Sequence, residues 1–441
     1  MKILSIETSC DETGISMIEA SGTAARPKLR VLGNALFSQT ETHAEYGGVF
    51  PMMAKREHVK NIVPLFRSCM AQAIDSCANG GIQHETLSPE ISAFTEQTVR
   101  DILSRENDLA DQLLKALGQM ESLDFDYIAV TEGPGLEPTL WVGISFAKAL
   151  AVIFNKPIIP ANHMEGHMVS VLMSGDAGDD ETVSSDASPR VIFPALALLI
   201  SGGHTELVQA DAWGSYKILG QTVDDAIGEA FDKVARLLNL PYPGGPKISK
   251  LAAESRAEGL AAAYANAHGA RLWNMPRPML HSKDFNFSFS GIKTAVLYGV
   301  KDRLAATSQA ELEEPEKKML AEEFENAVTE VIVRKTEKAL RESGARSLII
   351  GGGVIANIYI RNAFKELISR EFSATEEDGA PTVTLFTPSL DLSTDNSVMI
   401  GVAGYLRLIA AQAAGSEGAA TYQPTDLAKL SDLKARGNLG Y

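Results

Sequence analysis

A strand hairpin with a polar tip occurs twice in this chain, and this repetition constrains the fold more than any other feature. Residues 2–18 alternate as two strands around a polar tip at residues 9–14. An apolar run at residues 193–200 ends in a second polar tip, residues 201–205, before a strand at residues 206–208. Because later elements repeat this order loosely, the sequence predicts two similar α/β lobes around a cleft.

The segments between the hairpins predict helices and a mostly parallel sheet. Helical periodicity covers residues 54–78, and a strand, a helix and a strand follow at residues 127–130, 139–154 and 157–160. The expected bounds are lobe I at residues 1–190, lobe II with a nucleotide site at residues 191–394, and a C-terminal helix that returns to lobe I with a tail at residues 395–441. Within lobe I we expect a helical insertion at about 80–122 and an acidic linker at about 174–188.

Composition bounds the class of protein. A chain of 441 residues with 45% hydrophobic content is longer than one hydrophobic core usually organises, so two or more lobes are expected. The sequence shows no long apolar run and no leader segment, which predicts a soluble cytoplasmic protein. Three unpaired-looking cysteines, Cys10, Cys69 and Cys77, argue against a disulfide framework or a cysteine zinc site. The net charge of −16 means that RNA would need a local basic patch or a partner protein.

Two histidines indicate a metal site. His163 and His167 stand four residues apart at the start of an expected helix, about 40° apart around its axis, so two imidazoles can share one ion. Glu165 points to the opposite side, unlike the base of a zinc peptidase, and this disfavours a peptidase. Two surface histidines at a helix start remain the alternative.

Asp395 is a candidate third ligand. It precedes an expected apolar helix, so on local evidence alone an ordinary N-cap is favoured. A set of two histidines and one aspartate with an open position would suit Fe²⁺ or Zn²⁺.

Three glycine clusters, at residues 201–203, 242–245 and 351–353, permit close approach of backbone N–H groups to phosphate or sugar, although tight turns explain each one equally well. A helix expected at residues 223–238 carries the acidic stripe Asp225, Glu229 and Asp232, which is either a solvated face or a ribose site. Basic and aromatic residues alternate at residues 271–293, and this segment is either an RNA contact or one buried strand face.

Together these motifs resemble the tRNA N6-adenosine threonylcarbamoyltransferase family, TsaD type, formerly described as O-sialoglycoprotein endopeptidase-like. The residues that carry the resemblance follow one order along most of the chain: IETSCDET at 6–13, HAEYGGV at 43–49, GPGL at 133–136, HMEGH at 163–167, SGGHT at 201–205, GEAFDK at 228–233, YPGGP at 242–246, FSFSGIKT at 287–294, GGVIAN at 352–357 and TDN at 394–396.

The resemblance implies an actin/Hsp70-like duplicated fold and a metal-dependent acyltransferase. It implies that threonylcarbamoyl-adenylate donates its threonylcarbamoyl group to adenosine 37 of tRNAs that read codons beginning with A, with AMP as the other product. It assigns one divalent ion to His163, His167 and Asp395, with Fe²⁺ as the preferred ion and Zn²⁺ as the alternative. It assigns substrate contacts to Leu199, Ile200, Ser201, Gly202, Gly203, Asp232, Gly245 and Asn357.

Asp11 and Glu12, at the first hairpin tip, are candidate catalytic residues that accept the N6 proton or orient the acceptor. The resemblance also implies tRNA as a partner and, in bacteria, an inactive paralogue and a small ATPase. One departure is residues 51–56, PMMAKR, which lack the family's usual carboxylate. An ATP-dependent phosphotransferase or ATPase of the same fold is the main alternative function, and a non-catalytic scaffold is a third.

Overall fold

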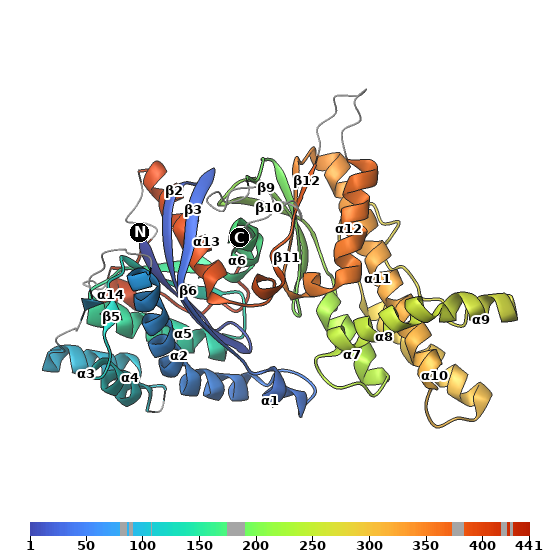
Figure 1. Ribbon diagram of the computed structural model, residues 1–441, viewed down its shortest axis with the longest axis horizontal. Coiled ribbons are helices and arrows are strands. Elements are labelled where there is room, and N and C mark those ends of the chain that lie inside the picture. The colour runs from blue at the N-terminus through green and yellow to red at the C-terminus, as the bar shows by residue number, and fades with distance from the viewer. Residues whose placement is uncertain are drawn as a thin grey trace. The chain divides into compact units, whose positions relative to one another are not determined.

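The computed structural model (Figure 1) describes residues 1–79, 86–87, 91–106, 108–173, 190–372, 383–415, 421–423 and 427–441. The chain forms two compact units. Unit 1 comprises Met1–Glu41, Val49–Arg190 and Pro388–Tyr441, and unit 2 comprises Thr42–Gly48 and Val191–Thr387. The expected linker at about 174–188 and residues 80–85, 88–90 and 107 of the expected insertion lie outside the described residues.

Unit 1 is built on a five-stranded sheet in the order β3-β2-β1-β6-β7. Its strands are β1 (Lys2–Glu7), β2 (Glu12–Thr23), β3 (Arg26–Ser38), β6 (Tyr127–Gly133) and β7 (Ile158–Asn162). The first three strands pair antiparallel, and β6 and β7 run parallel to β1. The predicted first hairpin is therefore confirmed, with Ile6 opposite Ile15 in the register of β1 and β2.

Helices cover both faces of this sheet because the side chains of a strand alternate between its faces. On one face, Leu4 and Ile6 join a core with α2 (Pro51–Asn79) and α5 (Glu137–Phe154). On the other face lies α13 (Ser397–Ala413), where a Cβ added to Gly401 would lie 2.9 Å from Ser5 Oγ. This close packing requires glycine and fixes α13 against the central strand.

The remaining elements of unit 1 are short: β4 (Thr86–Leu87), α3 (Ala93–Ile102), α4 (Leu109–Leu117), β5 (Ser122–Leu123), α6 (His163–Val169), η1 (Ser170–Met173), η3 (Leu390–Leu392) and α14 (Leu427–Leu430). Helix α1 (Thr40–Ala44) begins in unit 1 and ends in unit 2. The described part of the helical insertion expected at about 80–122 thus contains two helices, α3 and α4, with a break between them. Lys55 on α2 pairs with Glu106 in this break at 3.0 Å, and Glu106 is buried.

One helix of the described chain, α5, is long and apolar enough to cross a membrane, with a mean hydropathy of 1.3 over 18 residues. However, 72% of that stretch is buried inside the fold, and α5 packs against β6 and α2 as a core helix. Its composition is therefore explained by its place in the core.

Unit 2 repeats the sheet of unit 1 strand for strand. Its order is β10-β9-β8-β11-β12, again with three antiparallel strands followed by two parallel ones. The strands are β8 (Ala195–Ile200), β9 (Thr205–Ala212), β10 (Ser215–Gln221), β11 (Ser347–Gly351) and β12 (Thr384–Phe386). The same order and directions in both units confirm the predicted duplicated α/β fold of the actin/Hsp70-like type.

The helices of unit 2 enclose its core: α7 (Ile227–Leu237), α8 (Gly244–Glu258), α9 (Leu260–His268), α10 (Ser290–Thr307), α11 (Glu314–Ser343), η2 (Gly353–Ala356) and α12 (Ile358–Glu371). The prediction that α7 begins at residue 223 was wrong. Asp224 instead accepts hydrogen bonds from the hydroxyl groups of Ser288 and Ser290, both at 2.6 Å, and from two backbone N–H groups there. These contacts hold residues 222–226 in a turn at the start of α10.

Candidate functional site

The short helix α6 presents the two histidines together. Asn162, the last residue of β7, caps α6 because its side-chain Oδ1 accepts from the backbone N–H groups of Met164 at 2.8 Å and Glu165 at 3.1 Å. His163 and His167 therefore project from one side of the helix, with ring centroids 4.6 Å apart. Both side chains are buried, so the surface-histidine alternative is excluded.

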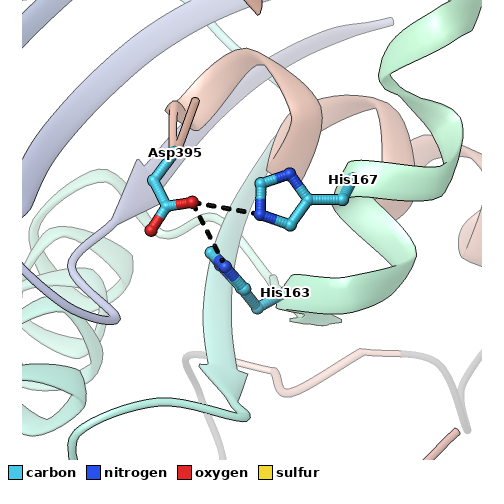
Figure 2. Close-up of side chains that lie close together, drawn as sticks. All are labelled: His163, His167 and Asp395. Atoms are coloured by element: carbon cyan, nitrogen blue, oxygen red, sulfur yellow. Dashed lines mark ion pairs between the residues drawn. The ribbon is translucent and has the colours of Figure 1, made fainter. Parts of the chain in front are cut away.

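Asp395 completes the cluster from the turn before α13 (Figure 2). One oxygen, Oδ1, lies 3.0 Å from Nε2 of His167 and 3.4 Å from Nε2 of His163. The cap of α13 is the next residue, Asn396, whose Oδ1 accepts from the backbone N–H of Met399 at 3.0 Å. The local expectation that Asp395 is the helix cap was therefore wrong.

The three side chains fit a divalent ion. Their ligand atoms all lie within 4.8 Å of one another. Nε2 of each histidine faces the same carboxylate oxygen of Asp395, an arrangement that one shared ion could bridge. Nδ1 of His167 is buried and makes no hydrogen bond within the described residues. Burial opposes ionisation of Asp395, but His163 and His167 hold the pKa of its carboxyl well below the usual range.

A buried network behind His163 was not predicted from the sequence. Glu7, at the end of β1, lies with Oε2 at 3.3 Å from Nδ1 of His163. The same carboxylate accepts hydrogen bonds from the hydroxyl of Thr131 and the backbone N–H of Ser9, each at 2.5 Å. Burial raises the pKa of Glu7, yet the neighbouring His163 lowers it on balance. Glu7 thus orients the imidazole so that Nε2 faces Asp395.

The tip of the first hairpin contacts this network: the hydroxyl of Ser9 lies 3.1 Å from Nδ1 of His163. Glu12 accepts from the hydroxyl of Ser38 at 3.0 Å, and Asp11 is buried. Burial, and then the negative charges of Asp11 and Asp395, raise the pKa of Glu12 well above its usual value. This environment favours proton uptake by Glu12.

His58 fixes the hairpin tip from α2. One of its ring nitrogens, Nδ1, is 2.7 Å from the hydroxyl of Thr13, and the other is 3.0 Å from the carbonyl oxygen of Cys10. A histidine within an amphipathic helix gives no sequence signal of such a role.

The predicted donor residues lie in unit 2, and five of them, residues 199–203, are at the end of β8. Leu199 and Ile200 have fully buried side chains, so any contact they make with a ligand uses their backbone. Ser201 accepts from the backbone N–H of His204 at 3.1 Å, which closes the turn that carries Gly202 and Gly203. Both glycines are exposed.

Glycines in this region serve two different purposes. In the part of the chain that the structure describes, a Cβ on Gly202, Gly203 or Gly245 would meet nothing within 4 Å. By contrast, a Cβ on Gly228 would lie 2.7 Å from the carbonyl oxygen of Ser201, and one on Gly244 would lie 2.5 Å from Cβ of Ala235. Packing therefore explains Gly228 and Gly244, whereas the first three leave room for a ligand.

The side chains of Asp232 and Asn357 both link helices of unit 2. The carboxylate of Asp232 accepts from the backbone N–H of Gly244 at 2.7 Å, which links α7 to the start of α8. The amide nitrogen of Asn357 donates to Ser249 at 2.8 Å and to the buried Glu325 at 2.6 Å, while its oxygen caps α12. Both side chains therefore also have a role in positioning helices.

The acidic stripe is partly neutralised. Lys233 contacts Asp225 and Glu229, each at 2.7 Å, and Asp225 precedes α7 instead of lying within it. Only Asp232 among the stripe is turned toward α8.

The basic and aromatic segment follows the buried-face alternative. Phe287 and Phe289 are fully buried, and Trp273 is nearly so, whereas Phe285 is partly buried against the core of unit 2. Arg277 contacts Glu323 at 2.6 Å and Glu330 at 2.8 Å. Its charge is therefore already paired within unit 2.

Comparison with known proteins yields one family. Residues 30–78 and 96–402 match the model of the family described as tRNA N6-adenosine threonylcarbamoyltransferase. A protein of that name from Chromobacterium violaceum is 37% identical over 94% of this chain and 95% of its own length. Proteins of the same name from Nitrosomonas europaea and Neisseria gonorrhoeae are 38% and 35% identical over 92% of this chain and 93% and 94% of theirs.

Proposed function

This chain belongs to the tRNA N6-adenosine threonylcarbamoyltransferase family, and we propose that it takes the threonylcarbamoyl group from threonylcarbamoyl-adenylate. The acceptor in this proposal is N6 of adenosine 37 in tRNAs that read codons beginning with A. The products are tRNA with N6-threonylcarbamoyladenosine (t6A) at that position and AMP. An ATP-dependent phosphotransferase is not favoured, because the matched family and the relatives described above are threonylcarbamoyltransferases.

The metal ligands in this proposal are His163, His167 and Asp395. Two imidazoles and one carboxylate with open positions are typical of Fe²⁺ sites, and Zn²⁺ is the alternative. The observation that carries the assignment is the convergence of Nε2 of His163 and Nε2 of His167 on Oδ1 of Asp395. When bound, such an ion supplies Lewis-acid polarisation of a carbonyl oxygen.

The protein must also manage a proton. The N6 amine is a weak nucleophile because its lone pair is delocalised into the adenine ring, and it loses a proton as the new bond forms. We assign proton acceptance or acceptor orientation to Asp11 or Glu12. Both stand at the hairpin tip whose Ser9 contacts His163, and the raised pKa of Glu12 suits a general base.

Donor contacts are proposed for the group of residues around the end of β8 in unit 2. The backbone N–H groups of Gly202 and Gly203 would hold the donor, while the backbone N–H of Ser201 donates to the carbonyl oxygen of His204 at 2.9 Å and shapes the turn; the open space at Gly245 supports this placement. The full proposed set is Leu199, Ile200, Ser201, Gly202, Gly203, Asp232, Gly245 and Asn357.

Partners and location complete the proposal. The net charge of −16 offers tRNA no general attraction, which supports a local contact or a partner protein. We propose an inactive paralogue and a small ATPase as those partners and the cytoplasm as the location. The lobe bounds given above, 1–190, 191–394 and 395–441, likewise remain a proposal.

Incubation with threonylcarbamoyl-adenylate and unmodified tRNA, followed by nucleoside mass spectrometry, tests the reaction. We expect t6A and stoichiometric AMP from the parent protein, and a loss of at least 100-fold from His163→Ala, since a metal ligand is removed. His268→Ala is the matched control, because His268 is an exposed histidine of unit 2. Full t6A formation by a metal-free His163→Ala protein would exclude the proposed role of the metal.

A further inference from the structure

The C-terminal segment, residues 427–441, is built into unit 1. The side chains of Leu430 and Leu433 are buried in its core, and the carbonyl oxygen of Leu433 accepts from the buried ammonium group of Lys148 at 2.7 Å. Upstream, Tyr422 forms an isolated antiparallel bridge with Ile158 of β7. The chain leading to this segment thus pairs with the edge strand β7, which is followed directly by α6, the helix that carries His163 and His167.

The segment then crosses the ends of β6 and β7. The backbone N–H of Arg436 donates to the carbonyl oxygen of Glu132 at 2.8 Å, and the backbone N–H of Gly135 donates to Gly437 at 3.1 Å. A Cβ on Gly133 would lie 2.0 Å from the carbonyl oxygen of Arg436, so this crossing requires glycine at residue 133. Figure 1 shows the C-terminus beside α6, in agreement with these contacts.

Asn162 joins the segment to the metal helix. Its Oδ1 caps α6 through Met164 and Glu165, while its Nδ2 donates to the carbonyl oxygen of Gly440 at 3.2 Å. The residue directly after Asn162 is His163. One buried amide therefore connects the last turn of the chain to the helix that carries both histidines.

We propose that the C-terminal segment is a positioning element for the metal ligands and that it acts through Asn162. The bond to Gly440 fixes which way the amide faces, so that Oδ1 stays directed at the first turn of α6. Residues that orient metal ligands in this indirect way typically change metal affinity 10- to 100-fold. The inference rests on the proposed metal site, but it concerns residues that do not touch the ion.

Two variants break the link from opposite sides. Asn162→Ser keeps a capping oxygen but removes the donor to Gly440, and deletion of residues 439–441 removes the acceptor while leaving Leu433 and Arg436 in place. Asn438→Ser is the matched control because Asn438 is exposed in the same segment. Full-length parent and variants are titrated with Fe²⁺ or Zn²⁺ against a chelator of known affinity.

We expect each single variant to bind the ion about 10- to 100-fold more weakly, with the control unchanged. Because both changes break one link, the double variant should bind no more weakly than the worse single variant. Equal urea midpoints for parent and Asn162→Ser would separate positioning from general destabilisation. Parent-like affinity in Asn162→Ser, or additive losses in the double variant, would overturn the inference. Failure of the parent itself to bind metal would instead reject the metal site.

Discussion

Replacing Gly245 by alanine should separate donor binding from stability. Gly245 is the second residue of α8, and in the described chain an alanine Cβ there would meet nothing within 4 Å. Alanine loses less conformational freedom than glycine on folding, so we expect the free energy of unfolding to rise by about 0.4–1 kcal/mol. Donor affinity should fall at least tenfold, about 1.4 kcal/mol, because the methyl group fills the space assigned to the donor.

The neighbouring Gly244 provides a matched control. A Cβ there would lie 2.5 Å from Cβ of Ala235 and 2.8 Å from Cα of Asp232, and the second contact involves backbone that cannot turn aside. Gly244→Ala should therefore lower the free energy of unfolding by about 1–3 kcal/mol. The same substitution at adjacent positions is thus expected to have opposite effects on stability.

Urea unfolding would measure stability, and calorimetric titration with a non-hydrolysable threonylcarbamoyl-adenylate analogue would measure donor affinity. If Gly245→Ala binds the analogue as tightly as the parent, the space beside α8 does not hold the donor. If it is less stable than the parent, the reasoning from open space at Gly245 fails.

Three further changes are expected to have distinct effects. His167→Ala should abolish metal binding, measured by elemental analysis, with an unchanged circular dichroism spectrum, because its ring contacts Asp395 of the proposed site and hydrogen-bonds no other described residue. Burial lowers the pKa of Lys148 to about 8, below its ordinary value of 10.5, so between these pH values the unfolded chain holds a proton that the folded chain has lost. The free energy of unfolding of the parent, relative to Lys148→Met, should therefore rise with pH across this window by up to about 1.4 kcal/mol per pH unit. Urea unfolding at pH 7.5 and 9.5 would measure this rise. Arg277→Ala should lower the free energy of unfolding by about 1–3 kcal/mol, because the guanidinium group binds Glu323 and Glu330. For the same reason, tRNA affinity and its salt dependence should not change. A flatter salt dependence in a filter-binding assay would instead indicate that Arg277 contacts RNA.

Periodicity predicted the fold well where one element carries the signal. The hairpin tips and the long helices were confirmed because alternation and helical spacing are local properties. The start of α7 was misplaced by four residues, since the contacts of Asp224 with the start of α10 are tertiary and leave no periodic trace.

The metal cluster shows the same division. The histidine pair follows from spacing on one helix, but Asp395 was favoured as a cap on local grounds, and only the family resemblance assigned it to the metal. Glu7 was missed, although an acidic residue that ends the apolar strand Lys2–Glu7 is a signal that the sequence contains. Glu7 is fully buried, which in general requires a charged or hydrogen-bonding partner.

The order of synthesis follows from the way unit 1 is assembled. Helix α13 packs on the central strands of the first sheet, and its Tyr405 hydroxyl donates to the carbonyl oxygen of Gly22, 383 residues earlier. A ribosome adding roughly 5–20 residues per second therefore completes all of unit 2 before the first sheet receives its covering helix. During that interval the nascent chain exposes one apolar face of its N-terminal sheet and holds both histidines without Asp395. The covering helix of the N-terminal sheet and Asp395 of the proposed metal site are thus both supplied only late in synthesis.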